Sequence, residues 1–192
     1  MFPAIQEAIT RRRMLWITPF AFAALAAIWP RRGNQAAASD GVEVTIVKFS
    51  DQGANLETAI VKKVVHSDSE WRKLLTSEQY YVTRHAATDT AFTGTYYQIH
   101  ETGLFRCICC ANALFSSEAK FDSGTGWPSF RAPIAEENVR KHSDISFGME
   151  RIEVLCKRCD AHLGHVFDDG PPPTNLRYCI NESSLRFIRR SS

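Results

Sequence analysis

The sequence predicts a mainly β domain that follows short helices and contains a structural metal site. From about Phe92 to Phe187 the apolar stretches are short, rich in aromatic and β-branched residues, and separated by Gly, Asp, Asn and Pro. This pattern is typical of antiparallel sheet. Two Cys-x-x-Cys pairs lie in the same region, and two helix-capping sequences precede it. With 192 residues, 44% of them hydrophobic, the chain can bury a substantial core as one globular domain.

The N-terminal part, residues 1–41, reads as an export signal or membrane anchor followed by a linker. Three arginines (11–13) precede an apolar run (14–29), and three alanines (36–38) follow it, which is the order of a secretory signal. Residues 10–15 resemble a twin-arginine export signal. A retained anchor is the alternative, although the run is shorter than the roughly 20 residues of a membrane-spanning helix. We expect the globular part to work in the periplasm, or tethered to the membrane and facing it.

The charge of the remaining chain argues against a nucleic-acid partner. The formal net charge is +2, but residues 1–38 carry five arginines and one acid, which leaves 18 basic and 20 acidic residues. A folded part so close to neutrality offers no basic stripe for nucleic acid. We therefore expect no nucleic-acid partner, and membrane contact only through the N-terminal segment if it is not cleaved.

One strand and two short helices are expected before the cysteine-rich region. Residues 42–47 alternate in hydrophobicity like a short strand. Ser67-x-x-Glu70 and Thr76-x-x-Gln79 are capping boxes, and each precedes a group of apolar residues. Two short helices should therefore begin at these positions.

The two Cys-x-x-Cys pairs predict a structural zinc site. Cys107 with Cys110, and Cys156 with Cys159, can each present two thiolates from one tight turn, and two such turns complete a tetrahedron. The pairs are 45 residues apart, more than in the simplest zinc ribbon, so the site would join distant segments of a larger sheet. Disulfides are the alternative, because an exported protein permits them.

A separate cysteine, Cys179, has neighbours that suit a nucleophile. A cysteine at its free pKa of about 8.5 is mostly protonated at neutral pH. If the segment is a strand, Arg177 and Asn181 project on the same face as Cys179, where the guanidinium can stabilise the thiolate. An inert core cysteine is the alternative, but it gives no reason for the Arg-x-Cys-x-Asn pattern.

Two histidines and a tryptophan are further candidates. His162 and His165 could donate protons near neutral pH, or be structural. They could also form a local metal site with the second cysteine pair, but the two-residue gap after Cys159 would crowd the backbone. Trp127 could form the wall of an apolar substrate pocket, with core packing as the equal alternative.

These candidates lie in four stretches by which the chain resembles the B-type methionine sulfoxide reductases, the family that reduces the R epimer of methionine sulfoxide. The stretches are CxxCxxALF at 107–115, KFDSGTGWPSF at 120–130, CxxCDAHLGHVFDDGP at 156–171 and RYCIN at 177–181. Weaker similarity extends back through Trp71. The resemblance implies a catalytic domain of residues 42–188, followed by a tail of residues 189–192.

The resemblance also implies a fold, a cofactor and a reaction. The fold would be Mss4-like, or β-tent, with two antiparallel sheets and one Zn²⁺ held by the two cysteine pairs away from the active site. Cys179 would attack the sulfoxide sulfur, one or both histidines would protonate its oxygen, and Trp127 would pack against its methyl group. Arg177 and Asn181 would form the polar surroundings. The substrates would be oxidised proteins carrying methionine-R-sulfoxide, with the free amino acid as a further one, and the role would be repair under oxidative stress.

The attack would leave Cys179 as a sulfenic acid, which a second thiol must reduce. In many relatives a resolving cysteine occupies the position of Thr125, and threonine cannot form a disulfide. Cys109 is the only other thiol left, but it lies inside a zinc knuckle, and a disulfide requires Cα atoms within about 7 Å. We expect an external reductant instead, such as a thioredoxin-like protein or a small thiol.

Two other functions remain open from the sequence alone. A noncatalytic zinc-ribbon interaction module would explain both cysteine pairs but not the pattern around Cys179. A dithiol oxidoreductase would use one Cys-x-x-Cys pair as its redox centre. Zinc bound to all four thiols would exclude that second reading.

Overall fold

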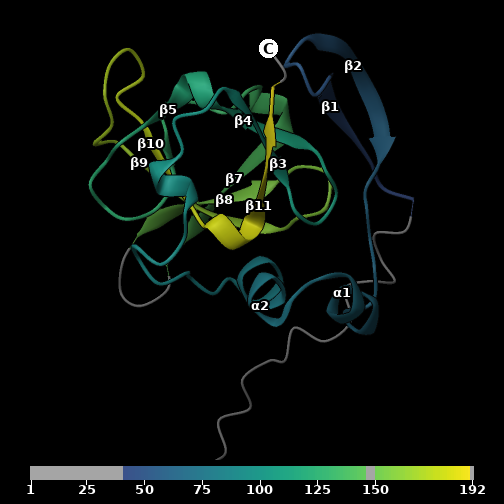
Figure 1. The fold of residues 1–192 in the computed structure, drawn as a ribbon. Helices are drawn as coiled ribbons and strands as arrows, with labels where there is room; N and C mark the ends of the chain where they lie inside the picture. Colours follow the sequence, from purple (N-terminus) through teal and green to yellow (C-terminus); the bar gives the residue numbers. More distant parts are fainter. Residues whose placement is uncertain (1–40, 146–149, 191–192) are drawn as a thin grey trace, which may run out of the picture. The chain divides into compact units, whose positions relative to one another are not determined.

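The computed structural model describes residues 41–145 and 150–190, so the expected export signal lies outside the described residues. Figure 1 shows the order of the elements. The strands are β1 (Glu43–Phe49), β2 (Asn55–Lys62), β3 (Gly103–Cys107), β4 (Ala113–Ser116), β5 (Lys120–Phe121), β6 (Ser129–Phe130), β7 (Val139–Asp144), β8 (Arg151–Cys156), β9 (His162–Phe167), β10 (Arg177–Ile180) and β11 (Leu185–Arg189). The helices are α1 (Asp68–Leu74) and α2 (Ser77–His85), with 3-10 turns η1 (Tyr96–Gln98), η2 (Ser117–Ala119), η3 (Glu136–Asn138) and η5 (Glu182–Ser184).

The strands form three sheets, and every pair in them is antiparallel. A six-stranded sheet has the order β5-β6-β10-β9-β8-β7, and a three-stranded sheet has the order β11-β3-β4. The predicted mainly β fold with two antiparallel sheets is therefore confirmed. The hairpin β1–β2 adds a separate two-stranded sheet, and β1 covers residues 43–47 of the strand expected at 42–47 and continues to Phe49.

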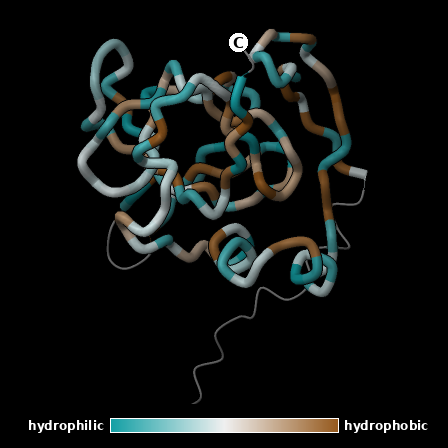
Figure 2. The backbone as a smooth tube through the Cα atoms, viewed as in Figure 1, coloured by the Kyte–Doolittle hydropathy of each residue, from teal (hydrophilic) through white to brown (hydrophobic). Residues whose placement is uncertain are grey.

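Aromatic side chains from the two larger sheets form the centre of the core. Phe115 of β4 stacks on Phe130 of β6, with ring centroids 4.4 Å apart, and Phe105 of β3 meets the same ring edge-on at 5.0 Å. All three are fully buried, as is Tyr178 of β10. Hydrophobic and hydrophilic residues are interspersed along the chain (Figure 2), and along β10 fully buried residues alternate with partly exposed ones.

Both predicted capping boxes are present. The Ser67 side chain accepts from the backbone N–H of Glu70, and the Glu70 carboxylate accepts from that of Ser67; Thr76 and Gln79 repeat the arrangement at α2. Helix α2 packs against η5 and β9, which places it beside the end of β10. In the described part of the chain, the helices are all too short or too polar to cross a membrane.

A buried asparagine attaches the β1–β2 hairpin to the main body. The Asn138 side chain is fully buried, accepts from Val47 N–H, and donates to the carbonyls of Val47 and Ala113. Its side chain thus satisfies three backbone groups from β1 and β4. Buried backbone groups without partners are costly, so this residue fixes the hairpin in place.

We expect Asn138→Ala to lower the free energy of unfolding by about 3 kcal/mol, because it leaves three buried backbone groups unpartnered. Urea unfolding followed by tryptophan fluorescence measures the change. The exposed Asn55→Ala on β2 is the matched control and should change stability by less than about 0.5 kcal/mol. Equal stability of the two variants would contradict the assignment of Asn138 as the anchor of the hairpin.

Candidate zinc centre and active site

The two Cys-x-x-Cys turns have the same backbone geometry. In the first, Ala111 N–H donates to the Cys107 carbonyl and Cys107 N–H to that of Asn112. In the second, Asp160 and Ala161 play the same parts around Cys156. The fifth residue of each turn is left-handed, with φ of 59° at Ala111 and 54° at Asp160. Each turn therefore directs two thiols to one side, as a zinc knuckle does.

The four sulfur atoms converge at one point between the larger sheets. The Sγ atoms of Cys107, Cys110, Cys156 and Cys159 all lie within 4.8 Å of one another. Two of these separations are 3.5 and 3.6 Å, close to the roughly 3.8 Å edge of a tetrahedron with Zn–S bonds of about 2.3 Å. All six cysteines lie in the described residues and are free, so the disulfide alternative fails. The donor set fits a structural zinc ion, which supplies cross-linking between the sheets when bound.

Charged side chains support both knuckles from outside. Arg84 of α2 donates to the Cys159 carbonyl, and Arg158 donates to the Cys110 carbonyl. Cys109 lies beside this cluster, near Thr83 and Arg84. The groups next to Cys179 are different ones, namely Arg177, Thr125 and Asp169. The structure thus places Cys109 with the zinc ligands rather than with the nucleophile candidate.

Cys179 lies in β10, as the sequence predicted for a strand residue. Its direct partner across the sheet is His165 of β9, which in turn is opposite Glu153 of β8. Directly opposed residues point to the same face, so these side chains share one row on the polar side of the sheet. Gly164 permits this approach, since a Cβ there would lie 2.1 Å from the Cys179 carbonyl oxygen.

Burial has a larger effect on the pKa of Cys179 than the neighbouring cation does. Burial raises the pKa of the Cys179 thiol above its ordinary value, while Arg177 and Thr125 lower it by less. The predicted contact with Arg177 exists, but Arg177 also donates two hydrogen bonds to Asp169, at 2.8 and 2.9 Å. The negative charge of Asp169 further raises the pKa of Cys179. Arg177 thus favours the thiolate, as the sequence suggested, but burial raises the pKa of Cys179 by more.

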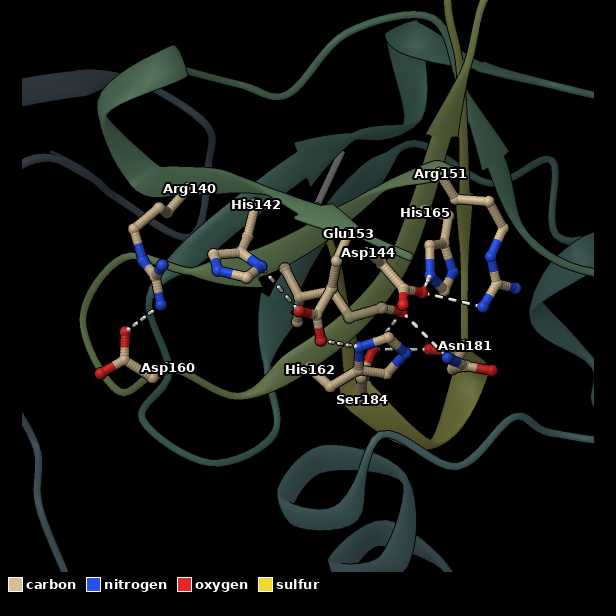
Figure 3. Close-up of polar contacts among 11 residues, drawn as sticks. Arg140, His142, Asp144, Arg151, Glu153, Asp160, His162, His165, Asn181 and Ser184 are labelled. Carbon is tan, nitrogen blue, oxygen red and sulfur yellow. Dashed lines mark hydrogen bonds and ion pairs between the residues drawn. The ribbon is translucent and has the colours of Figure 1, made fainter. Parts of the chain in front are cut away.

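His162 is buried and forms a hydrogen bond with Glu153. His162 is 3% exposed, and its Nδ1 lies 2.7 Å from the Glu153 carboxylate (Figure 3). Burial alone would raise the pKa of Glu153, but the bond to His162 and the nearby His165 and His142 lower it below its ordinary value. Glu153 is therefore ionised and orients the His162 ring.

His165 is held by a carboxylate on the other side of the row. Its Nε2 lies 2.8 Å from Asp144 Oδ2, which also accepts from Arg151 (Figure 3). Burial lowers the pKa of His165, and the cation of Arg151 lowers it further, although Asp144 opposes both. With Nε2–H directed at Asp144, Nδ1 is the proton acceptor of the neutral ring. The local metal site considered for the two histidines does not form among the described residues, because the ligands that converge there are the four cysteines without either histidine.

Asn181 and Trp127 meet at the backbone of Asp89. The Asn181 amide accepts from Asp89 N–H and donates to the Leu163 carbonyl. Trp127 Nε1 donates to the Asp89 carbonyl at 3.0 Å. Both polar ends of the Asn181 amide are thus occupied by backbone, so this residue positions the site rather than offering its amide to Cys179. Trp127 is half-buried and lines a cavity of about 190 Å³ whose lining is largely polar.

Sequence reasoning missed the carboxylates that position the site. Glu153 alternates with Arg151 along one strand, a signal that could have indicated a shared polar face. Asp144 and Asp169 follow no recognisable spacing from the residues they bind. Thr125 was identified as the position of the usual resolving cysteine, and the structure places its hydroxyl beside Cys179.

The fold and these two centres define a thiol protein built on a zinc-braced β domain. The chain belongs to the SelR domain family, whose match covers residues 75–189. It is 56% identical to a protein of Herminiimonas arsenicoxydans over 128 residues, which are 67% of this chain and 93% of that protein. It is 58% identical to one of Hahella chejuensis over 125 residues (65% and 90%), and 55% identical to one of Pseudomonas aeruginosa over 122 (64% and 92%). Each relative is a peptide methionine sulfoxide reductase MsrB.

We expect Cys156→Ser to lose bound zinc and to lower the free energy of unfolding by about 3 kcal/mol or more, because metal binding contributes directly to folding. Metal content by mass spectrometry and urea unfolding measure the two effects. Cys109→Ser is the matched control, since it removes a neighbouring thiol that is outside the converging set. A Cys156→Ser protein that keeps one zinc per chain would contradict the ligand assignment.

We expect Asp169→Asn to lower the pKa of Cys179, because it removes a negative charge that raises it. The thiolate should then form at lower pH, and the rate of Cys179 alkylation by iodoacetamide should rise earlier in a pH series. Mass spectrometry of the Cys179 peptide separates this thiol from the others. Asp168→Asn, an exposed neighbour, should leave the midpoint in place; a shift to higher pH in Asp169→Asn would refute the electrostatic role.

Proposed function

We propose that this protein reduces methionine-R-sulfoxide in proteins to methionine, with Cys179 as the nucleophile, and so repairs oxidised proteins. The observation that carries the proposal is the pairing of Cys179 with His165 across β9 and β10, within a chain of the SelR family. His165 is fixed by Asp144 and has a ring nitrogen able to accept a proton. The curated relatives support the same activity by name.

The protonation states of the pair suggest how the step proceeds. The raised pKa of Cys179 and the lowered pKa of His165 leave a neutral thiol beside a neutral imidazole at neutral pH. As the sulfur attacks, His165 can take the thiol proton and pass it to the sulfoxide oxygen. The S–O bond of the substrate breaks while a new S–O bond forms at Cys179. The products are methionine and a cysteine sulfenic acid, and no further proton is consumed.

Other side chains have supporting parts in this proposal. Trp127 packs against the sulfoxide methyl, and Arg177 lies beside the reacting sulfur. His162, held by Glu153, forms the buried wall behind His165, with ring centroids 5.5 Å apart. The zinc centre is structural, and its position beside η5 supports the segment that follows Cys179.

An external thiol resets the enzyme in this proposal. The hydroxyl of Thr125, rather than a thiol, lies beside Cys179, and Cys109 lies with the zinc ligands. A dithiol protein of the thioredoxin type, or a small thiol, would attack the sulfenic sulfur and release water. A second thiol then forms the disulfide of the reductant, and Cys179 returns to its reduced state.

We also propose that residues 1–41 direct the protein out of the cytoplasm. The support is the sequence order of arginines, apolar run and small residues, with similarity to a twin-arginine signal. A retained anchor would place the same domain on the outer side of the membrane. Cell fractionation with N-terminal sequencing of the mature chain separates the two outcomes.

Single-turnover reduction of resolved R and S epimers, with thiols counted before and after, tests the mechanism. We expect the R epimer alone to react and the protein to lose one titratable thiol, because no internal partner resolves Cys179. Cys179→Ser should abolish the reaction while zinc content stays unchanged. Turnover by Cys179→Ser, or equal use of both epimers, would sink the proposal.

The same assay with Thr125→Cys tests the recycling route. A thiol placed beside Cys179 should attack the sulfenic acid, so this variant should lose two thiols per turnover and form a disulfide. Ser69→Cys, an exposed position of α1, is the control. Loss of two thiols in the unaltered protein would show an internal resolving partner and contradict external recycling.

A further inference from the structure

We infer that the cavity beside Trp127 is a subsite for a lysine or arginine side chain that flanks the methionine sulfoxide in a protein substrate. The inference rests on the proposed function and specifies the substrate further. The cavity has a volume of about 190 Å³, and Trp127 forms part of its wall. A residue close to the sulfoxide in an extended chain, at roughly 3.5 Å per residue, can therefore reach it.

The lining of this cavity is acidic. Three carboxylates contribute to it, from Glu78 of α2, Asp89 of the following loop and Glu182 of η5. None of the lining residues is a lysine or an arginine. Such a concave surface with charge of one sign attracts the opposite charge and repels its own.

One carboxylate oxygen in the wall has no partner among the described residues. Asp89 is only 9% exposed, and its Oδ2 accepts from Ser183 N–H. Its Oδ1 is buried and accepts no hydrogen bond. A buried carboxylate oxygen without a donor is costly, and Asp89 lines the cavity, so a substrate cation held beside this carboxylate would offset that cost.

The geometry favours an organic cation over a metal ion. Both oxygens of Glu182 already accept from the loop, from the N–H groups of Thr95 and Tyr96 and the Thr95 hydroxyl. Within the described residues, the four zinc-binding cysteines form the one cluster of ligating groups that converges on a point. The remaining acceptors, buried Asp89 and exposed Glu78, instead suit the donors of an ammonium or guanidinium group.

Trp127 gives the cavity and the reaction centre a shared wall. Its indole is held by the Asp89 carbonyl, so the residue that carries the unpartnered oxygen also fixes the ring. A cation over an indole face gains further attraction. Occupation of the cavity would therefore hold the substrate chain at the residue against which the sulfoxide methyl packs.

The test uses peptides with methionine-R-sulfoxide at the centre and Lys, Ala or Glu at one of the two positions on either side. Reduction by the full protein is followed with excess dithiothreitol. We expect at least one lysine position to lower KM roughly three- to ten-fold relative to alanine, with kcat little changed and the effect weaker at high salt. Glutamate at that position should raise KM.

Substitutions in the cavity test whether its carboxylates cause the preference for lysine. Glu78→Gln should bring the ratio of the lysine and alanine peptides close to one, and Asp89→Asn should do the same if it folds. Glu137→Gln, an exposed glutamate of η3 outside the cavity, should keep the ratio of the unaltered protein. Equal KM for lysine and glutamate peptides, or a lysine preference that survives Glu78→Gln, would overturn the inference. Failure to reduce the alanine peptide would instead count against the proposed function.

Discussion

The convergence of four thiols between two sheets is the constraint on which the rest of the structure depends. Cys107 ends β3 of the three-stranded sheet, and Cys156 ends β8 of the six-stranded sheet, so zinc binding fixes the spacing of the two layers. Leu185 of β11 lies opposite Cys107, and Ser184 accepts from Ile108 inside the first knuckle. The segment that leaves the candidate nucleophile is thus tied to the metal turn within five residues. Bringing these distant parts of the chain together costs conformational entropy, which the free energy of metal binding offsets.

Burial and the surrounding charges have opposing effects on the pKa of Cys179. A buried thiol is a poor nucleophile at rest, and burial here raises its pKa despite the adjacent guanidinium. Asp169 engages Arg177 in a two-bond ion pair and so reduces the stabilisation available to a thiolate. Such an arrangement limits unwanted oxidation of the resting cysteine, because oxidants react with the thiolate. Reactivity then depends on the neighbouring His165 taking the thiol proton and passing it to the substrate.

Local signals in the sequence predicted local structure. Contacts between residues far apart in the sequence could not be predicted from it. The capping boxes at Ser67 and Thr76, the two knuckles and the β10 strand each depend on residues within a few positions, and all are present. The four zinc ligands could be predicted because two Cys-x-x-Cys pairs have few other uses in a protein. Asp144 meets His165 from 21 residues away, a pairing set by the β7-β8-β9 register that no single-sequence pattern reveals. Asn181 was expected to share the face of Cys179 and to offer its amide there. Its amide instead binds the backbone of Asp89 and Leu163.

Three consecutive residues after β10 connect the chemistry to the loop that precedes β3. Asn181 binds Asp89 N–H, Glu182 binds the N–H groups of Thr95 and Tyr96, and Ser183 donates to the Asp89 carboxylate. The loop in turn holds the Trp127 indole. Only Asn181 separates the end of β10 from the start of η5. A shift of the strand that carries Cys179 would therefore also move the cavity wall. The proposed recognition of residues around methionine sulfoxide and the proposed attack on its sulfur therefore depend on the same turn, whose Ser184 carbonyl accepts from Ile108 in the zinc knuckle.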